Sequence, residues 1–267
     1  GSVGCVNGIG VVVMALAIAR LPQAFSALGY DDVDAIRLSF WTMAAYTLLL
    51  AAILRAGLQG AAASGRRAAR NLFRQTLEGL AAARDNRRIL LAYGTAFASR
   101  GDLVILTTFL SLWLIQAGVD AGLSPAEATS RAGRIFGLAQ GVAMLWSPVM
   151  GLILDRVPRL AGVALAFALA AAGYAALGLV PEADGGWLLL AALLCGIGEA
   201  SAVVSAGVLI GQEAPAATRG TVIGTFALAG SLGIVCLSFS GGLVFDRISP
   251  QAPFLLMAAV NGLVMLA

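Results

Sequence analysis

The sequence predicts an all-α integral membrane protein, a polytopic bundle of about eight transmembrane helices. Of its 267 residues, 60% are hydrophobic and only 12% are charged, where an ordinary soluble domain has about 25% charged residues. The mean hydropathy of +0.91 agrees with this composition. The apolar residues also gather into runs that are long enough to cross a bilayer core of roughly 30 Å.

Eight apolar runs, bounded by charges, Pro or Gly, are the expected helices. They cover approximately residues 3–21, 35–55, 89–117, 135–154, 160–180, 187–210, 222–245 and 254–267. The last run holds roughly 14 residues, too few to span at about 1.5 Å per residue, so we expect it to be a truncated helix. The chain starts at Gly1 with no charged segment before the first run, so we expect a fragment rather than a signal peptide.

The connection between the second and third runs is the one long loop. It contains Arg66, Arg67, Arg70, Arg74, Arg84, Arg87 and Arg88. Leu72, Phe73, Leu77 and Leu80 recur within it at helical spacing, which predicts an amphipathic helix lying on lipid headgroups.

The distribution of arginine predicts the orientation, because cytoplasmic loops carry the excess of positive residues. One side of the membrane collects Arg55, the seven loop arginines, Arg156, Arg159 and Arg219, and the other collects Arg20, Arg37, Arg131, Arg134 and Arg247. The long loop is therefore expected in the cytoplasm, and the protein in the inner (cytoplasmic) membrane.

The composition argues against several other functions. The absence of His removes His-based catalytic triads and His-ligated metals. Cys5, Cys195 and Cys236 have no CxxC spacing, so we interpret them as buried thiols. The net charge of +3 is too small for a basic patch that follows phosphates. We expect no enzyme activity, metal, cofactor or nucleic-acid partner.

The connection between the fourth and fifth runs resembles a signature of the major facilitator superfamily, Gly-x-Leu-x-Asp-Arg-x-Gly-Arg, which follows helices 2 and 8 in that family. Gly151, Asp155, Arg156 and Arg159 match it, whereas Leu152 lies one place early and Pro158 replaces a Gly. A similar string at residues 242–247 falls on the other side of the membrane. The turn containing Pro215, Arg219 and Gly220 also looks like the Pro-x-x-x-Arg-Gly turn between helices 10 and 11.

The resemblance implies that the runs correspond to helices 5 to 12 of a twelve-helix transporter, with helices 1 to 4 missing. Residues 1–56 would end the N-terminal bundle (helices 5 and 6), residues 57–88 would be the cytoplasmic central loop, and residues 89–267 would form the C-terminal bundle (helices 7 to 12). The signature residues would form a cytoplasmic gating latch. In it, Gly151 would permit close helix approach, and Asp155 would accept from a helix N-terminus or from Arg156 and Arg159.

Three ionisable residues fall at the centre of expected spans, where each costs about 2.5 to 3.5 kcal/mol on insertion scales. They are Arg100, Asp102 and Glu199, on the expected helices 7 and 10, which line the central cavity in the family that the chain resembles. Arg100 is a candidate for binding solute, and Asp102 and Glu199 are candidates for proton coupling. Further candidate cavity residues are Tyr93 and Phe97, with Gln140 and Trp146 from helix 8.

Several alternatives stay open. Arg100 and Asp102 point about 200° apart on a regular helix, so both face a cavity only if the helix breaks near Gly94 or Gly101. The charges could instead form structural ion pairs, either with missing helices or between Arg100 and Glu199. The small residues around Glu199 fit either close packing or a cavity wall.

The sequence thus favours a monomeric secondary transporter that moves a small organic solute across the lipid bilayer by alternating access, coupled to protons if a buried carboxylate carries them. A transporter-like receptor or assembly protein without flux is the alternative, and an intramembrane enzyme is a weaker one.

The predicted orientation can be tested with a cysteine at Ser64. We expect an impermeant thiol reagent to label it in inside-out vesicles but not in intact cells, because the arginines hold the loop in the cytoplasm. Labelling in intact cells would reverse the orientation.

Overall fold

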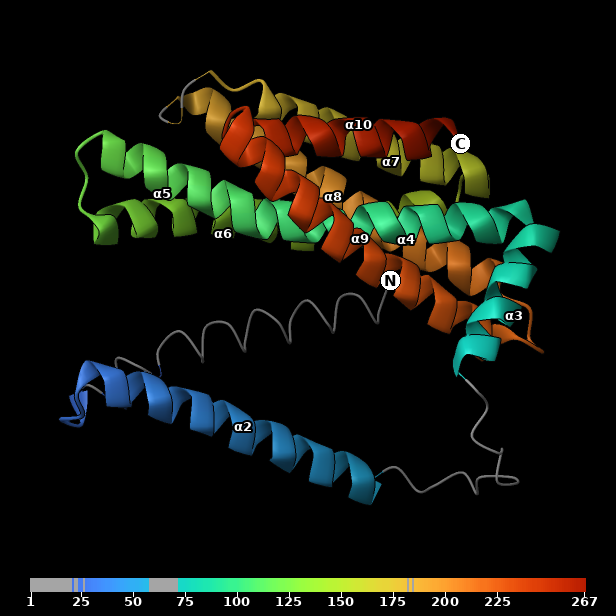
Figure 1. The fold of residues 1–267 in the computed structure, drawn as a ribbon, viewed down its shortest axis with the longest axis horizontal. Helices are drawn as coiled ribbons and strands as arrows, with labels where there is room; N and C mark the ends of the chain where they lie inside the picture. Colours follow the sequence, from blue (N-terminus) through green and yellow to red (C-terminus); the bar gives the residue numbers. More distant parts are fainter. Residues whose placement is uncertain (1–20, 22–23, 26, 58–71, 182, 184) are drawn as a thin grey trace. The chain divides into compact units, whose positions relative to one another are not determined.

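A computed structural model describes the chain except for residues 1–20, 22–23, 26, 58–71, 182 and 184. The regular elements of the described residues are all helices (Figure 1). They are α2 (Asp32–Gly57), α3 (Leu72–Asp85), α4 (Arg87–Ile105), the π-helix η1 (Leu106–Leu110), α5 (Ser111–Asp120), α6 (Pro125–Leu154), α7 (Arg159–Gly178), α8 (Gly186–Glu213), α9 (Arg219–Arg247) and α10 (Ala252–Leu266).

Six described helical segments are long and apolar enough to cross a membrane. They are Val33–Gly57, Arg87–Asp120, Glu127–Leu154, Arg159–Gly178, Gly186–Glu213 and Arg219–Arg247. These segments confirm the second to seventh apolar runs, and the last run forms the shorter helix Ala252–Leu266. The first run lies outside the described residues apart from its last position. The chain is therefore a multi-pass helical membrane protein.

The described part of residues 5–70 belongs to one compact unit and residues 71–267 form another. In the first unit, α2 is a single long helix in which the Ser39 hydroxyl donates to the Ala35 carbonyl at 2.7 Å. In the second unit, α8 packs against α4, α6 and α7, while α10 packs against α4, α7 and α9. The second unit contains all the central charges that the sequence singles out.

The third run is one span, Arg87–Asp120, interrupted by η1. The helix α4 is regular through Gly94 and Gly101, so neither glycine breaks it, and the irregular turn comes later, at Leu106–Leu110. A π-turn widens the helix by one residue and shifts the faces of the residues that follow. Arg100 and Asp102 both precede it, so they keep the opposite directions of a regular helix.

The helices begin at capping signals as well as at apolar residues. Ser124 caps α6: its hydroxyl accepts from the Glu127 backbone N–H, and its own backbone N–H donates to the Glu127 carboxylate. This capping box starts α6 about ten residues before the predicted apolar run. A cap pairs the free backbone N–H groups of the first turn, so that turn does not need apolar side chains.

Glycines bring the helices of residues 71–267 into backbone contact. A methyl group at Gly173 would lie 2.7 Å from the Cys195 Cα atom, and one at Gly198 would lie 2.5 Å from the Ala170 Cα atom. Gly196 contacts Ala139 of α6 in the same way. The small residues around Glu199 therefore serve close packing. Cys195 is buried as expected, but Cys236 is exposed, because it lies on an outward face of α9; Cys5 is outside the described residues.

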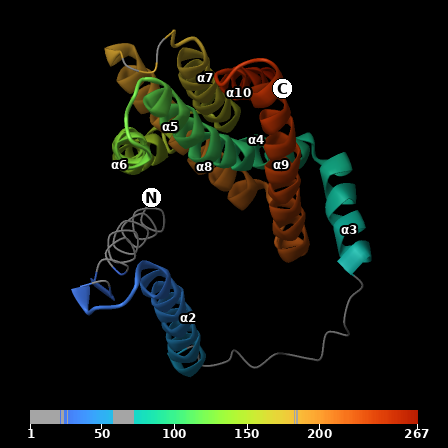
Figure 2. The same cartoon turned by 60° about the vertical axis from the view of Figure 1, so that its left-hand side comes forward.

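The predicted amphipathic helix is present as α3, and it contacts α4 and α9 (Figure 2). Its Gly79 lies against Thr225 of α9, and the Tyr93 hydroxyl of α4 donates to the Gly79 carbonyl at 3.0 Å. Leu77 and Leu80 stay about half exposed. The face with small residues thus docks on the bundle, and the leucine face is left open for the expected headgroup contact.

Two alanine substitutions in α8 test the backbone contact. Gly198→Ala should destabilise the protein by about 1–3 kcal/mol, because the new methyl group overpacks against α7. Gly207→Ala is the matched control, since nothing lies within 4 Å of a methyl group there, and higher helix propensity should leave it neutral or slightly stabilised. Thermal unfolding of both variants in lipid nanodiscs measures the difference; equal melting temperatures would contradict the packing.

Candidate functional site

Glu199 lies inside the bundle with one neutral partner. Its residue is 4% exposed, and the Gln140 amide of α6 donates to its Oε2 at 3.0 Å. Two turns further along α6, the Trp146 indole N–H donates to the Ser201 hydroxyl at 2.8 Å. Two of the predicted cavity residues, Gln140 and Trp146, are therefore half-buried and tie α6 to α8.

Asp102 is buried where α4 meets α7 and α10. The Asn261 side-chain amide of α10 donates to Asp102 Oδ1 at 2.7 Å, and the Tyr174 hydroxyl of α7 donates to the Asp102 backbone carbonyl at 2.7 Å. Asp102 and Asn261 both have no exposed surface. Asp102 thus joins three helices inside the unit and does not lie on an open face.

Arg100 lies on the opposite side of α4 from Asp102 and is exposed. Its side-chain stem runs beside Gly230 of α9. Among the described residues Arg100 has no carboxylate partner, so the alternative in which it pairs with Glu199 is wrong. Nor do Asp102 and Glu199 have an arginine partner within the described part of the chain, and both carboxyl groups rely on amides.

The remaining predicted cavity residues lie apart from each other. Tyr93 is buried and holds α3 through its hydroxyl, so it does not line an open space in residues 71–267. Phe97 is half-buried against Gly233 of α9. The described residues also form an apolar hollow of about 360 Å³ at the end of α7 and the start of α8, which none of the predicted cavity residues lines.

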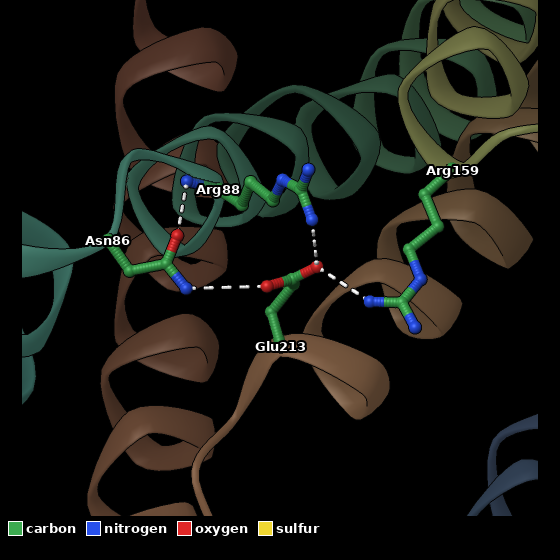
Figure 3. Close-up of polar contacts among 4 residues, drawn as sticks. All are labelled: Asn86, Arg88, Arg159 and Glu213. Carbon is green, nitrogen blue, oxygen red and sulfur yellow. Dashed lines mark hydrogen bonds and ion pairs between the residues drawn. The ribbon is translucent and has the colours of Figure 1, made fainter.

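A second polar group joins the ends of three helices around Glu213, the last residue of α8 (Figure 3). One carboxylate oxygen, Oε1, accepts from Arg159 at 2.9 Å and from Arg88 at 3.4 Å, and the other accepts from the Asn86 amide at 3.3 Å. Asn86 also caps α4. The Glu213 side chain is 9% exposed, whereas both arginine side chains are 52% exposed. We call these four residues the Glu213 network.

The predicted gating latch differs from this arrangement. Arg159 belongs to the Glu213 network rather than pairing with Asp155, which is exposed like Arg156 and joins no ion pair in the described structure. The physical reason is that Asp155 follows the end of α6 and faces water, whereas Glu213 is enclosed beside the start of α7. A methyl group added at Gly151 would meet nothing within 4 Å, so close packing within the described part of residues 71–267 does not require a glycine there.

The predicted turn before α9 is close to its expected place. The turn itself covers residues 214–218, and Arg219 and Gly220 form the first turn of α9. The Arg219 guanidinium donates to the Gly211 carbonyl at 3.5 Å and so covers one of the free carbonyls at the end of α8.

Several residues of these contacts have no role in the predictions from the sequence, among them Glu213, Asn86, Ser201, Asn261 and Tyr174. Glu213 falls at a membrane edge, where a charged residue is common and gives no signal of its own. Asn261 carried a usable signal, since a lone amide in an apolar helix needs a partner. Tyr174, a single polar tip in the apolar run of α7, carried a weaker signal of the same kind.

The geometry is that of a polytopic bundle whose central carboxyl groups accept hydrogen bonds from amides, with charged contacts at one end. The chain matches the Major Facilitator Superfamily over residues 1–235 and 148–267 and therefore belongs to that superfamily. Its proteins are in general transporters rather than enzymes. The assignment of the apolar runs to helices 5 to 12 is consistent with this match.

Proteins of two kinds are identical to this chain at about a third of the aligned residues. The chain is 36% identical over 180 residues to the magnetosome protein MamZ of Magnetospirillum gryphiswaldense and, equally, to that of Paramagnetospirillum magneticum. It is 33% identical over 174 residues to the magnetosome protein MamH of Paramagnetospirillum magneticum. The MamZ alignments cover 67% of this chain but 28% of MamZ, and the MamH alignment covers 65% of this chain and 40% of MamH.

A double-mutant cycle tests the Glu213 network. Arg159→Ala and Glu213→Ala should be non-additive by about 0.5–1 kcal/mol, the upper end for a pair whose arginine is half exposed. The control cycle pairs Arg156→Ala with Glu213→Ala and should be additive, because Arg156 is exposed and unpaired in the described structure. Denaturation of the purified variants gives both values. Equal coupling in the two cycles would mean that the contact contributes nothing specific.

Proposed function

We propose that the chain is part of a secondary active transporter that moves a small organic solute by alternating access, with Glu199 as the residue that carries the coupling proton. The observation behind this proposal is the environment of Glu199. It lies within a spanning helix, is almost fully buried, and has a neutral amide as its hydrogen-bond partner. A carboxyl group held in this way can bind a proton when enclosed and release it when a conformational change admits water.

Arg100 is the proposed contact for a polar or anionic solute. It is an ionisable residue in a spanning helix, and its guanidinium is uncommitted to any carboxylate of the described residues. Guanidinium groups bind carboxylates and phosphates through paired hydrogen bonds. Phe97 lies on the same side of α4, one turn earlier, and would add an apolar contact.

The Glu213 network supports the alternating part of the proposal. It joins the ends of α4, α7 and α8 through two arginine side chains that are half exposed to water, so it can form and break at little cost. We propose that it stabilises the conformation described here and opens in another one. Arg156 and Asp155, exposed beside it, are free to contact other parts of the transporter.

The proposed setting is the lipid bilayer of the inner membrane, with the protein acting as a monomer. The relatives MamZ and MamH are named magnetosome proteins. We propose that this chain is also a magnetosome protein. The alternative is a transporter-like receptor or assembly protein in the same membrane, which the flux experiment distinguishes.

Transport by the protein expressed from its complete gene, reconstituted in liposomes, tests the role of Glu199. Glu199→Gln should abolish uphill uptake driven by a pH gradient but keep solute exchange, because exchange requires no net proton movement. Asp246→Asn removes a carboxylate that is exposed at the end of α9 and should preserve both activities. Uphill uptake that survives in Glu199→Gln would contradict the assignment, and the absence of any flux in the wild-type protein would favour the receptor alternative.

Arg100→Ala should raise the apparent KM or abolish solute binding while leaving the melting temperature unchanged, since its side chain is exposed and forms no ion pair in the described structure. Removing one partner of a buried ion pair costs about 3 to 5 kcal/mol. A comparable loss of stability in Arg100→Ala would therefore show that the arginine is structural.

A further inference from the structure

The contact between Asp102 of α4 and Asn261 of α10 has an incomplete set of hydrogen bonds. The Asn261 amide nitrogen donates twice, to Asp102 Oδ1 at 2.7 Å and to the Met257 backbone carbonyl at 2.9 Å. The other oxygen of each side chain, Asp102 Oδ2 and Asn261 Oδ1, is buried without a hydrogen-bond partner. Two unpaired acceptors thus occur on the same pair of residues.

The orientation of the Asn261 amide follows from its contacts. An amide nitrogen carries two hydrogens, and each has an acceptor here. The reversed orientation would place the amide oxygen against the Met257 carbonyl and the Asp102 carboxyl, which are both oxygen acceptors. The unpaired atom of Asn261 is therefore an oxygen, and it requires a donor.

No cation balances a negative charge on Asp102 within the described residues. The titratable groups that face it are Tyr174 on α7 and Cys195 and Glu199 on α8. The packed helix α10 has no ionisable side chain. The ionisable side chains of α9, which are Arg219, Cys236, Asp246 and Arg247, are all exposed, as is Arg100 on α4 itself. An ionised carboxylate at this position would lack both water and a counter-ion, and it would face a second acidic group.

We infer that Asp102 is a proton-binding site, held as a neutral carboxylic acid in a cyclic pair with Asn261. A single proton on Oδ2 turns that acceptor into a donor, and the acceptor available on the facing group is Asn261 Oδ1. Two planar groups that are joined through one pair of atoms can close a second bond through the other pair. One proton therefore supplies a partner for both unpaired atoms.

This site has a different role from that of Glu199. The Asp102 proton completes the contact between α4 and α10, next to the bond from Tyr174 to the Asp102 backbone carbonyl. It is a structural proton that stays in place, whereas Glu199 is the group proposed to exchange its proton. The inference holds whether or not the protein transports a solute, because it concerns the protonation of one side chain.

Infrared spectroscopy of the purified protein in lipid nanodiscs tests the inference. The C=O stretch of a protonated carboxylic acid lies apart from the bands of ionised carboxylates and of amides. The difference between wild type and Asp102→Asn should contain this band from mildly acidic to mildly alkaline buffer, and Glu199→Gln should retain it. The lack of any such band in the difference spectrum would mean that Asp102 is ionised and would overturn the inference.

A substitution of Asn261 adds a readout that does not depend on the folding of Asp102→Asn. In Asn261→Leu, the protonated-acid band of Asp102 should move to higher frequency, because the acid loses its hydrogen-bonded partner. An unchanged band position would exclude the cyclic pair.

Thermal stability gives a third measurement. Asp102→Asn should keep the wild-type Tm, because its amide nitrogen donates to Asn261 Oδ1 where the proton did, whereas Asp102→Ala should lower Tm by several degrees through the loss of both bonds. Equal destabilisation by the two substitutions would show that a negative charge is needed at this position.

Discussion

Every polar group inside this bundle has to find its partner within the protein, because the hydrocarbon of a bilayer offers none. This constraint explains why the described elements are helices, which pair their own backbone groups. It also explains the side-chain contacts of the interior. Glu199 with Gln140, Trp146 with Ser201 and Asp102 with Asn261 each join two different helices. Each polar pair therefore requires its two helices to be neighbours, and it sets the position of one helix along the other.

Close packing makes these pairs possible. Hydrophobic burial does not drive helices together in lipid, so contact depends on van der Waals packing between closely spaced backbones. Gly173, Gly196 and Gly198 give α8 this contact with α6 and α7. At the end of α8 the environment changes to one reached by water, and the side chains change with it: Glu213 is held by two arginines, whereas Glu199 is held by an amide. The same helix thus has an ion-paired carboxylate at its end and an amide-bonded carboxyl group at its centre.

The sequence predicts the spans of this fold well and its contacts poorly. A bilayer sets the length of an apolar run, so six spans and the superfamily follow from the sequence. The π-turn at Leu106–Leu110 does not, because its residues show no Gly or Pro where the helix changes. The cost of a charge in lipid singles out Asp102 and Glu199 as residues that need a partner. Their partners were harder to find, because contacts depend on tertiary packing: Asn261 is 159 residues from Asp102, and Arg88 is 125 residues from Glu213.

The two carboxyl groups at the centre of the spans, Asp102 and Glu199, are paired with amides rather than with cations in the described structure. An experimental structure of the protein from its complete gene, determined in lipid nanodiscs with side chains resolved, tests this pairing. We expect Gln140 at hydrogen-bond distance from Glu199 and Asn261 at hydrogen-bond distance from Asp102. An arginine of any helix within 4 Å of either carboxyl group would contradict it and would make these residues members of structural ion pairs.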